Sequence, residues 1–253
     1  MGKHNRHGLS RTISADVKRE VRQRCGFGCV ICGLGFYDYE HFAPDFKDAT
    51  EHNPAGITLL CMQCNQKRAR RVLSAKTVAL ANANPRCLQD GFAKENWGFG
   101  SEPITVRFAG VEFVETPHLI EVNGTAMMSV LPPEEGSSIY RVSALFANVA
   151  GRTTLEIVEN EWYAKRHNWD VECAGNRITI RNAHRDVALV LKSEPPGLIT
   201  IEKLNMYFQG IYFRGDSSVL EISRDQRSWG KVSAMRSVRN RVGISINIGK
   251  VAT

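Results

Sequence analysis

The chain has 253 residues, 43% of them hydrophobic, and its formal net charge is +7 because 33 Lys and Arg outnumber 26 Asp and Glu. This length and apolar content predict a soluble globular protein with one large domain or two smaller ones. No stretch approaches the roughly 18 consecutive apolar residues of a membrane-spanning helix, and no apolar segment follows the basic start, so we expect neither a membrane anchor nor a signal peptide.

The N-terminal part of the chain predicts short helices and strands. Ser14, which follows a flexible basic arm, and Ser74 are both residues of the type that caps helix N-termini. Pro85 is expected to terminate the last of these helices. We expect helices over residues 15–25, 62–71 and 75–81, and strands over residues 36–39 and 57–60.

Beyond about residue 98 the pattern of residue types changes. Short runs of Val, Ile, Phe and Tyr alternate with Gly, Pro, Asn and Asp at spacings of about ten residues, which is typical of an all-β unit. A sandwich, a barrel or a solenoid would each produce this pattern. We therefore predict two domains, one of helices and strands over residues 1–97 and a β-rich accessory domain with a basic tail over residues 98–253.

Four of the seven cysteines form two pairs with the same spacing, Cys29 with Cys32 and Cys61 with Cys64. Each pair forms a tight turn that points two sulfurs at one spot, and two such pairs supply the tetrahedral sulfur shell that Zn²⁺ prefers. We predict a structural zinc site at these residues. An odd number of cysteines, four of them committed to a metal, fits a reducing compartment, so we expect a cytoplasmic protein.

Polar residues that suit metal chemistry lie beside these pairs. Glu40 and His41 follow the first expected strand, and Asn65 directly follows the last cysteine. Mg²⁺ takes hard oxygen ligands and keeps several waters, so one carboxylate and one amide, completed by phosphate and water, can hold it. A neutral histidine nearby can take a proton from water. Because adjacent strand residues point to opposite faces, we expect a bend or bulge at Glu40 and His41.

In combination these residues resemble the HNH, or ββα-metal, endonuclease motif with its zinc-knuckle embellishment, over about residues 22–75. The resemblance implies that His41 is the general base and that Glu40 and Asn65 bind a catalytic Mg²⁺ or Mn²⁺. It also implies an α+β fold, with an N-terminal zinc-stapled ββα-metal domain followed by an all-β domain. The matching segments are Cys29-Val-Ile-Cys32, Tyr39-Glu40-His41, residues 57–60 followed by Cys61-Met62-Gln63-Cys64-Asn65, and Lys67.

The motif departs from the common family pattern at three positions. Glu40 stands where Asp is commoner, and Asn65 stands in place of His. Gly56 occupies the place of the central asparagine, which in the family steadies the loop that bears the histidine. We expect Asn53 to orient that loop instead, with its neighbour His52 as the other candidate.

A run of basic residues follows the second cysteine pair. The excess of positive charge attracts a polyanion, and basic side chains beside a metal site are expected to meet the phosphates of DNA. The residues assigned to this nucleic-acid contact are Lys67, Arg68, Arg70 and Arg71.

The sequence thus predicts a metal-dependent HNH endonuclease that hydrolyses phosphodiester bonds in DNA. Phage defence is a setting suggested by analogy alone. One site cuts one strand, so a double-strand break needs two chains or two events, and a homodimer is one way to supply them. Two alternatives stay open: a non-catalytic zinc module that binds nucleic acid or a partner protein, and an RNA-directed nuclease. No feature indicates the partner of the β-rich domain.

Overall fold

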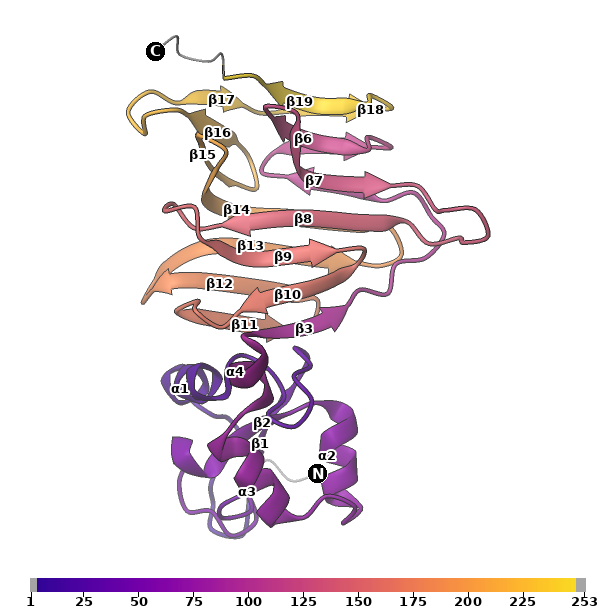
Figure 1. The fold of residues 1–253 in the computed structure, drawn as a ribbon. Helices are drawn as coiled ribbons and strands as arrows, with labels where there is room; N and C mark the ends of the chain where they lie inside the picture. Colours follow the sequence, from indigo (N-terminus) through magenta and orange to yellow (C-terminus); the bar gives the residue numbers. More distant parts are fainter. Residues whose placement is uncertain (1–3, 249–253) are drawn as a thin grey trace. The chain divides into compact units, whose positions relative to one another are not determined.

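The computed structural model describes residues 4–248, and the chain divides into two compact units. The N-terminal unit comprises the chain up to Glu95 together with Ala164–Gly175. The β unit comprises Asn96–Tyr163 and the chain from Asn176 onward. The elements of both can be followed along the colour scale of Figure 1. The N-terminal unit therefore includes a segment that lies, in sequence, between two parts of the β unit.

The N-terminal unit is built from short helices and a two-stranded antiparallel hairpin. The expected N-cap of α1 is confirmed, because the Ser14 side chain accepts a hydrogen bond from the backbone N–H of Val17, and Gly26 ends the helix with a φ of 74°. The elements are α1 (Ala15–Cys25), β1 (Asp38–His41), the 3₁₀ helix η1 (Pro54–Gly56), β2 (Ile57–Leu60), α2 (Met62–Ala69), α3 (Ala75–Ala83), α4 (Arg86–Asp90), β3 (Phe92–Asn96) and β11 (Asp170–Ala174).

The remaining strands form the β unit. They are β4 (Thr105–Phe108), β5 (Val111–Val114), β6 (His118–Val122), β7 (Thr125–Leu131), β8 (Arg141–Ala147), β9 (Thr153–Val158), β10 (Glu161–Lys165), β12 (Arg177–Ala183), β13 (Asp186–Glu194), β14 (Leu198–Phe208), β15 (Ile211–Asp216), β16 (Leu220–Ser223), β17 (Gly230–Val232), β18 (Met235–Val238) and β19 (Val242–Ile246).

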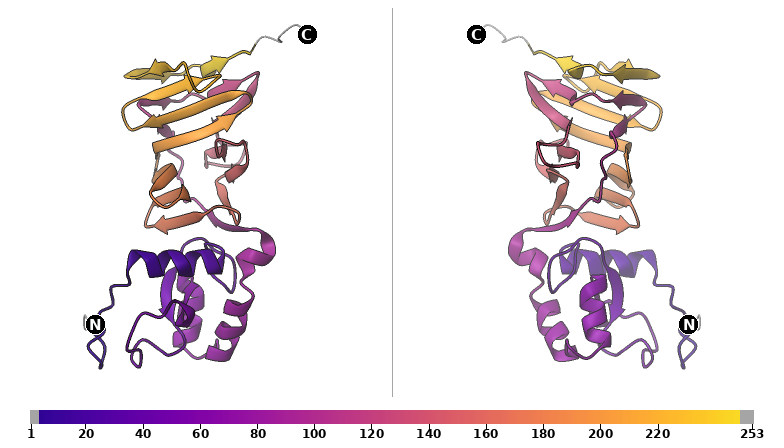
Figure 2. Two further views of the ribbon diagram at one scale, coloured as in Figure 1. Left: turned by 90° about the vertical axis from the view of Figure 1, so that its left-hand side faces the viewer. Right: turned by 90° about the vertical axis from the view of Figure 1, so that its right-hand side faces the viewer.

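Successive strands of the β unit pair side by side, from β6 to β10 in one sheet and from β12 to β17 in the other. Parallel pairings add β19 to β6, β18 to β5 and β4 to β14. Figure 2 shows the two sheets as two layers. Phe108, Phe146, Trp162 and Phe213 are fully buried in this unit. Of the three arrangements left open by the sequence, the structure has the two-layered sandwich.

The expected α+β class with an N-terminal ββα-metal domain is wrong. The chain is mostly β, with 45% strand and 15% helix, and no ββα-metal domain is evident in the described residues. The physical reason is that the predicted domain was centred on a short hairpin. Its strands β1 and β2 have 4 residues each, and a two-stranded sheet of this size is not stable without further packing. The prediction of a β-rich C-terminal region is confirmed. Within residues 4–248, no helix is both long and apolar enough to cross a membrane.

Candidate metal centre and active site

The four predicted zinc ligands converge in the structure. The sulfurs of Cys29, Cys32, Cys61 and Cys64 all lie within 4.8 Å of one another. Cys32 Sγ is 3.6 Å from Cys61 Sγ and 3.8 Å from Cys64 Sγ. Zn–S bonds near 2.3 Å in a tetrahedron separate sulfurs by about 3.8 Å. The cluster therefore has the ligand type, number and spacing that fit a structural metal such as zinc.

Local backbone geometry brings the sulfurs together. Gly33 adopts a φ of 81° and donates a backbone hydrogen bond to Cys29 O at 2.8 Å, which closes the first turn. Cys61 follows β2 and is the N-cap of α2, where its sulfur accepts from the backbone N–H of Cys64 at 3.4 Å. A metal bound here would fix the end of β2 and the start of α2 to the turn after α1.

The thiols also have uneven acidities. The hydrogen bond from Cys32 holds the pKa of the Cys29 thiol well below its ordinary value, at about 5. Burial raises the pKa of Cys64 to about 12. Several neighbouring thiolates repel one another, so a bound cation is needed to ionise the whole set. This chemistry also fits a metal.

Glu40 and Asn65 line one polar hollow with a volume of about 440 Å³, on the side of the hairpin next to α2. Asp45 and Arg68 line it as well. The guanidinium of Arg68 pairs with the Glu40 carboxylate, and its other nitrogen lies 2.6 Å from Asp45 Oδ1. Burial raises the pKa of Glu40, and Arg68 opposes that shift. The oxygen donors suit a hard cation, but in this structure the cation paired with Glu40 is Arg68.

His41 lies in a different environment from Glu40. It is 6% exposed, and its Nε2 is 3.0 Å from Nδ1 of His52. The ring of Phe46 packs against it with 5.3 Å between centroids. Burial, followed by the positive charges of His52 and Arg11, lowers the pKa of His41. These surroundings therefore disfavour the charged imidazolium form of His41.

The expected bend between Glu40 and His41 is not present. Glu40 pairs with Thr58 and His41 with Ile57 in an uninterrupted antiparallel register. The two side chains therefore leave β1 on opposite faces, and His41 is not among the residues that line the polar hollow in the described chain. The structure brings Glu40 and Asn65 together and places His41 on the other side of the strand.

The loop that ends at Gly56, the place of the family's central asparagine, is closed by backbone hydrogen bonds. Gly56 O accepts from the backbone N–H groups of Phe42 at 2.9 Å and Ala43 at 3.3 Å. A Cβ on Gly56 would lie 2.1 Å from Ala43 O, so only glycine fits there. Asn53 is exposed, and its side chain accepts from Ala55 N at 3.0 Å, which caps η1. Of the two loop candidates, it is His52 that contacts His41.

The four basic residues assigned to nucleic acid divide into two kinds. Lys67, Arg70 and Arg71 are exposed. The Arg68 side chain is only 14% exposed because it is engaged by Glu40 and Asp45. Three of the four are thus exposed to solvent, while Arg68 is engaged inside the polar hollow, which Arg71 also lines.

Contacts that the sequence did not indicate support β1. The Arg22 side chain is 3% exposed and binds Asp170 through two nitrogens, at 2.8 and 2.7 Å. Another nitrogen donates to Tyr39 Oη at 2.8 Å, directly before Glu40. The start of the chain is also docked, because Asn5 Nδ2 donates to Phe46 O at 2.6 Å. The partners are distant in sequence, so no local pattern signals them.

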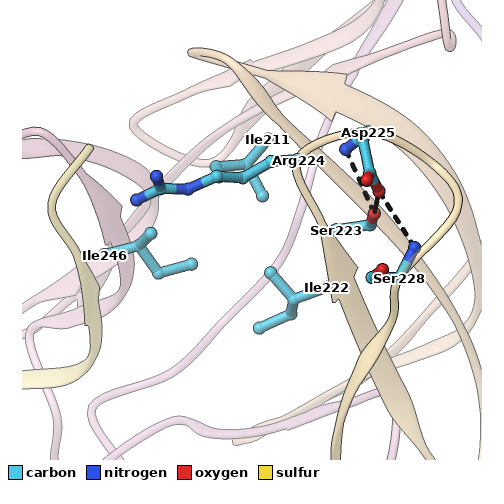
Figure 3. Close-up of a pocket in the computed structure, with 7 residues that line it drawn as sticks. All are labelled: Ile211, Ile222, Ser223, Arg224, Asp225, Ser228 and Ile246. Atoms are coloured by element: carbon cyan, nitrogen blue, oxygen red, sulfur yellow. Dashed lines mark hydrogen bonds between the residues drawn. The ribbon is translucent and has the colours of Figure 1, made fainter. Parts of the chain in front are cut away.

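A second hollow, of about 430 Å³, lies within the β unit (Figure 3). Isoleucine side chains and the Arg224 guanidinium line it. Its one carboxylate, Asp225, accepts from the backbone N–H of Ser228 at 2.9 Å and of Arg227 at 2.8 Å, and these bonds lower its pKa. Asp225 therefore closes a turn, and none of the predicted site residues lies in this hollow.

Comparison with known proteins adds no identification. No protein-family model, curated protein or solved structure matches the chain.

Proposed function

We propose that this protein is a metal-dependent endonuclease of the HNH type that hydrolyses phosphodiester bonds in DNA. The observation that supports it most is the polar hollow, which a carboxylate and an amide from separate elements, Glu40 and Asn65, line together. Asn65 directly follows the last residue of the four-cysteine cluster. Exposed basic side chains on α2 and directly after it, Lys67, Arg70 and Arg71, suit a phosphate backbone. A buried histidine, His41, lies next to Glu40 at the end of β1.

Glu40 and Asn65 are the residues that would hold Mg²⁺ or Mn²⁺. Such an ion, when bound, stabilises negative charge on the phosphate and on the leaving oxygen. Arg68 pairs with Glu40 in the structure, so it must release that carboxylate when the ion binds. The nitrogen released from Glu40 is then available to a phosphate oxygen, while the other nitrogen keeps its contact with Asp45.

His41 takes the proton from the attacking water. His41 is the last residue of β1 and leaves that strand on the face opposite to Glu40, so the phosphate would have to lie at the end of the strand to meet both residues. Zn²⁺ at the four cysteines keeps the hairpin and α2 in place. The cytoplasmic location, the antiviral setting and the homodimer stay predictions.

The test is nicking of supercoiled plasmid in Mg²⁺ or Mn²⁺ by the wild type and by His41→Ala. Loss of a general base should slow cleavage about 100-fold or more. His184→Ala, at an exposed position of the β unit, is the matched control and should cleave as the wild type does. Equal cleavage by His41→Ala would exclude this site. Parallel digestion of duplex DNA, single-stranded DNA and single-stranded RNA separates a DNA-directed from an RNA-directed enzyme.

One observation favours a second candidate, a non-catalytic zinc module that binds nucleic acid. Arg68 already neutralises Glu40, and Lys67, Arg70 and Arg71 form an exposed basic surface. Such a module would bind DNA with a strong salt dependence and would leave it uncut in either metal. Binding that is unchanged in Glu40→Gln, together with absent cleavage by the wild type, would favour it.

A further inference from the structure

One face of strands β14 to β17 carries aromatic and basic side chains. These strands lie side by side (Figure 1), and on one face Phe208 and Phe213 are buried in the core of the β unit. Alternate residues point to the other face, where Tyr212 and Arg214 of β15 are not buried. Tyr207 of β14 is the register partner of Tyr212, and their ring centroids are 5.0 Å apart. This second face therefore presents aromatic rings that the core does not use.

A row of charges crosses the strands beside these rings. Glu221 of β16 is the register partner of Arg214 on one side and of Lys231 on the other. Arg214 Nε donates to its carboxylate at 2.6 Å, and Lys231 Nζ lies 3.5 Å from it. The hydrogen bond from Arg214 lowers the pKa of Glu221, so at neutral pH two positive charges share one negative charge. The row therefore keeps one uncompensated positive charge.

The turn after β16 adds an indole ring to the same face. The guanidinium of Arg214 lies over the Trp229 ring, 3.9 Å from its centroid. Trp229 Nε1 donates to Gln226 O at 3.1 Å, so the polar atom of the indole is satisfied within the turn. The Arg214 side chain is 46% exposed. A second planar group can therefore stack on the side of the guanidinium that the indole does not cover.

The segment around this turn holds most of the excess charge of the chain. Residues 224–241 contain six Lys and Arg against one Asp, a net charge of +5 out of +7 for the whole chain. Two arginines of the segment pair with glutamates elsewhere in the β unit, but Arg224 and Arg227 are exposed on the turn. The carboxylate of Asp225 accepts from backbone N–H groups of the same turn. Such a surface attracts a polyanion.

We propose that this aromatic face, formed by Tyr207, Tyr212, Arg214, Trp229 and Lys231, binds single-stranded nucleic acid. Unpaired bases have free π-faces that stack on aromatic rings and guanidinium planes, whereas the bases of a duplex already stack on one another. The phosphates between these bases meet Lys231 and the exposed arginines of the turn. The β unit thereby has a partner of its own, whether or not the N-terminal unit cuts nucleic acid.

The test is binding of a fluorescein-labelled oligothymidylate of about 12 nucleotides to the full chain, measured by fluorescence anisotropy without added Mg²⁺ or Mn²⁺. Tyr212→Ala and Trp229→Ala should each raise Kd about 10-fold, as loss of one stacked base does. Kd for a duplex of the same length should change less than about 2-fold, because its bases do not stack on the protein. Tyr140→Ala removes a half-buried tyrosine between β7 and β8 and is the matched control that should bind as the wild type does. Thermal unfolding by circular dichroism checks that each variant folds.

Tryptophan fluorescence gives a readout at the aromatic face itself. An indole that stacks on a base loses emission, so the strand should quench the wild type. Trp229→Phe should remove most of this quenching and keep Kd within about 3-fold, because a phenyl ring also stacks. An oligouridylate titrated in parallel identifies whether RNA or DNA is the strand that binds more tightly.

Three results would overturn the proposal. The first is that the wild type does not bind the single strand, or that folded Tyr212→Ala and Trp229→Ala bind it with unchanged Kd. The second is an equal loss of affinity for strand and duplex, which indicates a general polyanion surface. The third is quenching that persists in Trp229→Phe, because the bases then stack elsewhere.

Discussion

The two units of this protein are each stabilised by different kinds of contact. In the β unit, strands of up to 11 residues bury aromatic side chains such as Trp162 and Phe213. The N-terminal unit has strands of only 4 or 5 residues, a cluster of four sulfurs and a buried Arg22–Asp170 ion pair. Short elements bury little apolar area, so specific bonds must replace it. The unit that carries the candidate site therefore depends on a few individual contacts, each of which can be removed singly.

Removal of the metal proposed for the four cysteines should have the largest effect. Structural zinc contributes on the order of 10 kcal/mol in small domains, so a strong chelator, or Cys61→Ser, should unfold the N-terminal unit and abolish cleavage. Hydrogen exchange should then show lost protection in β1, β2 and α2 and retained protection in β12 to β16. An equal loss of protection in both units would contradict the proposed difference in how the two units are stabilised.

Two variants serve as controls for the zinc experiment. Cys173→Ser, outside the cluster, should keep its zinc when measured by elemental analysis. Phe213→Ala should cost about 3–5 kcal/mol and also keep its zinc, because its cavity opens in the β unit.

Asp170→Asn should have the next largest effect. It leaves the Arg22 guanidinium buried without a full countercharge, which costs about 3–5 kcal/mol in urea-induced unfolding of the N-terminal unit. Glu172→Gln removes a looser contact, 3.3 Å long and 32% exposed at the glutamate, and should cost under about 1 kcal/mol. Equal losses for the two variants would show that burial of the pair is not what matters.

Gly56→Ala should have the smallest effect of the three. The added Cβ would collide with Ala43 O, and local overpacking costs about 1–3 kcal/mol. A Cβ on Gly98 meets nothing within 4 Å, so Gly98→Ala should stay within about 0.5 kcal/mol of the wild type. Chemical unfolding midpoints measure both. Identical midpoints would mean that the loop adjusts without strain.

Local signals in the sequence predict local features of this molecule. The cysteine spacing predicts the four-sulfur cluster, Ser14 predicts the start of α1, and residues 57–60 coincide with β2. Each depends on neighbours along the chain. The alternation of apolar residues likewise predicts the β-rich region, but it does not fix the pairing of the sheets.

The surroundings of the candidate site could not be predicted because their partners are remote. Arg22 and Asp170 are 148 residues apart, and Arg68 lies 28 residues from Glu40. His52 was one of two candidates for the loop, and only packing shows that its ring faces His41. The predicted α+β class is wrong because the motif residues lie on and around a short hairpin, which is a small part of a mostly β chain.

The segment Ala164–Gly175 determines when the N-terminal unit can be completed during synthesis of the chain. Arg22 leaves the ribosome 148 residues before Asp170, an interval on the order of 10 s at ordinary rates of synthesis. During that time the first unit to emerge lacks the carboxylate that its buried guanidinium needs. The N-terminal unit is therefore translated first but completed late. A fragment that stops after residue 97 lacks Ala164–Gly175, which belongs to that unit.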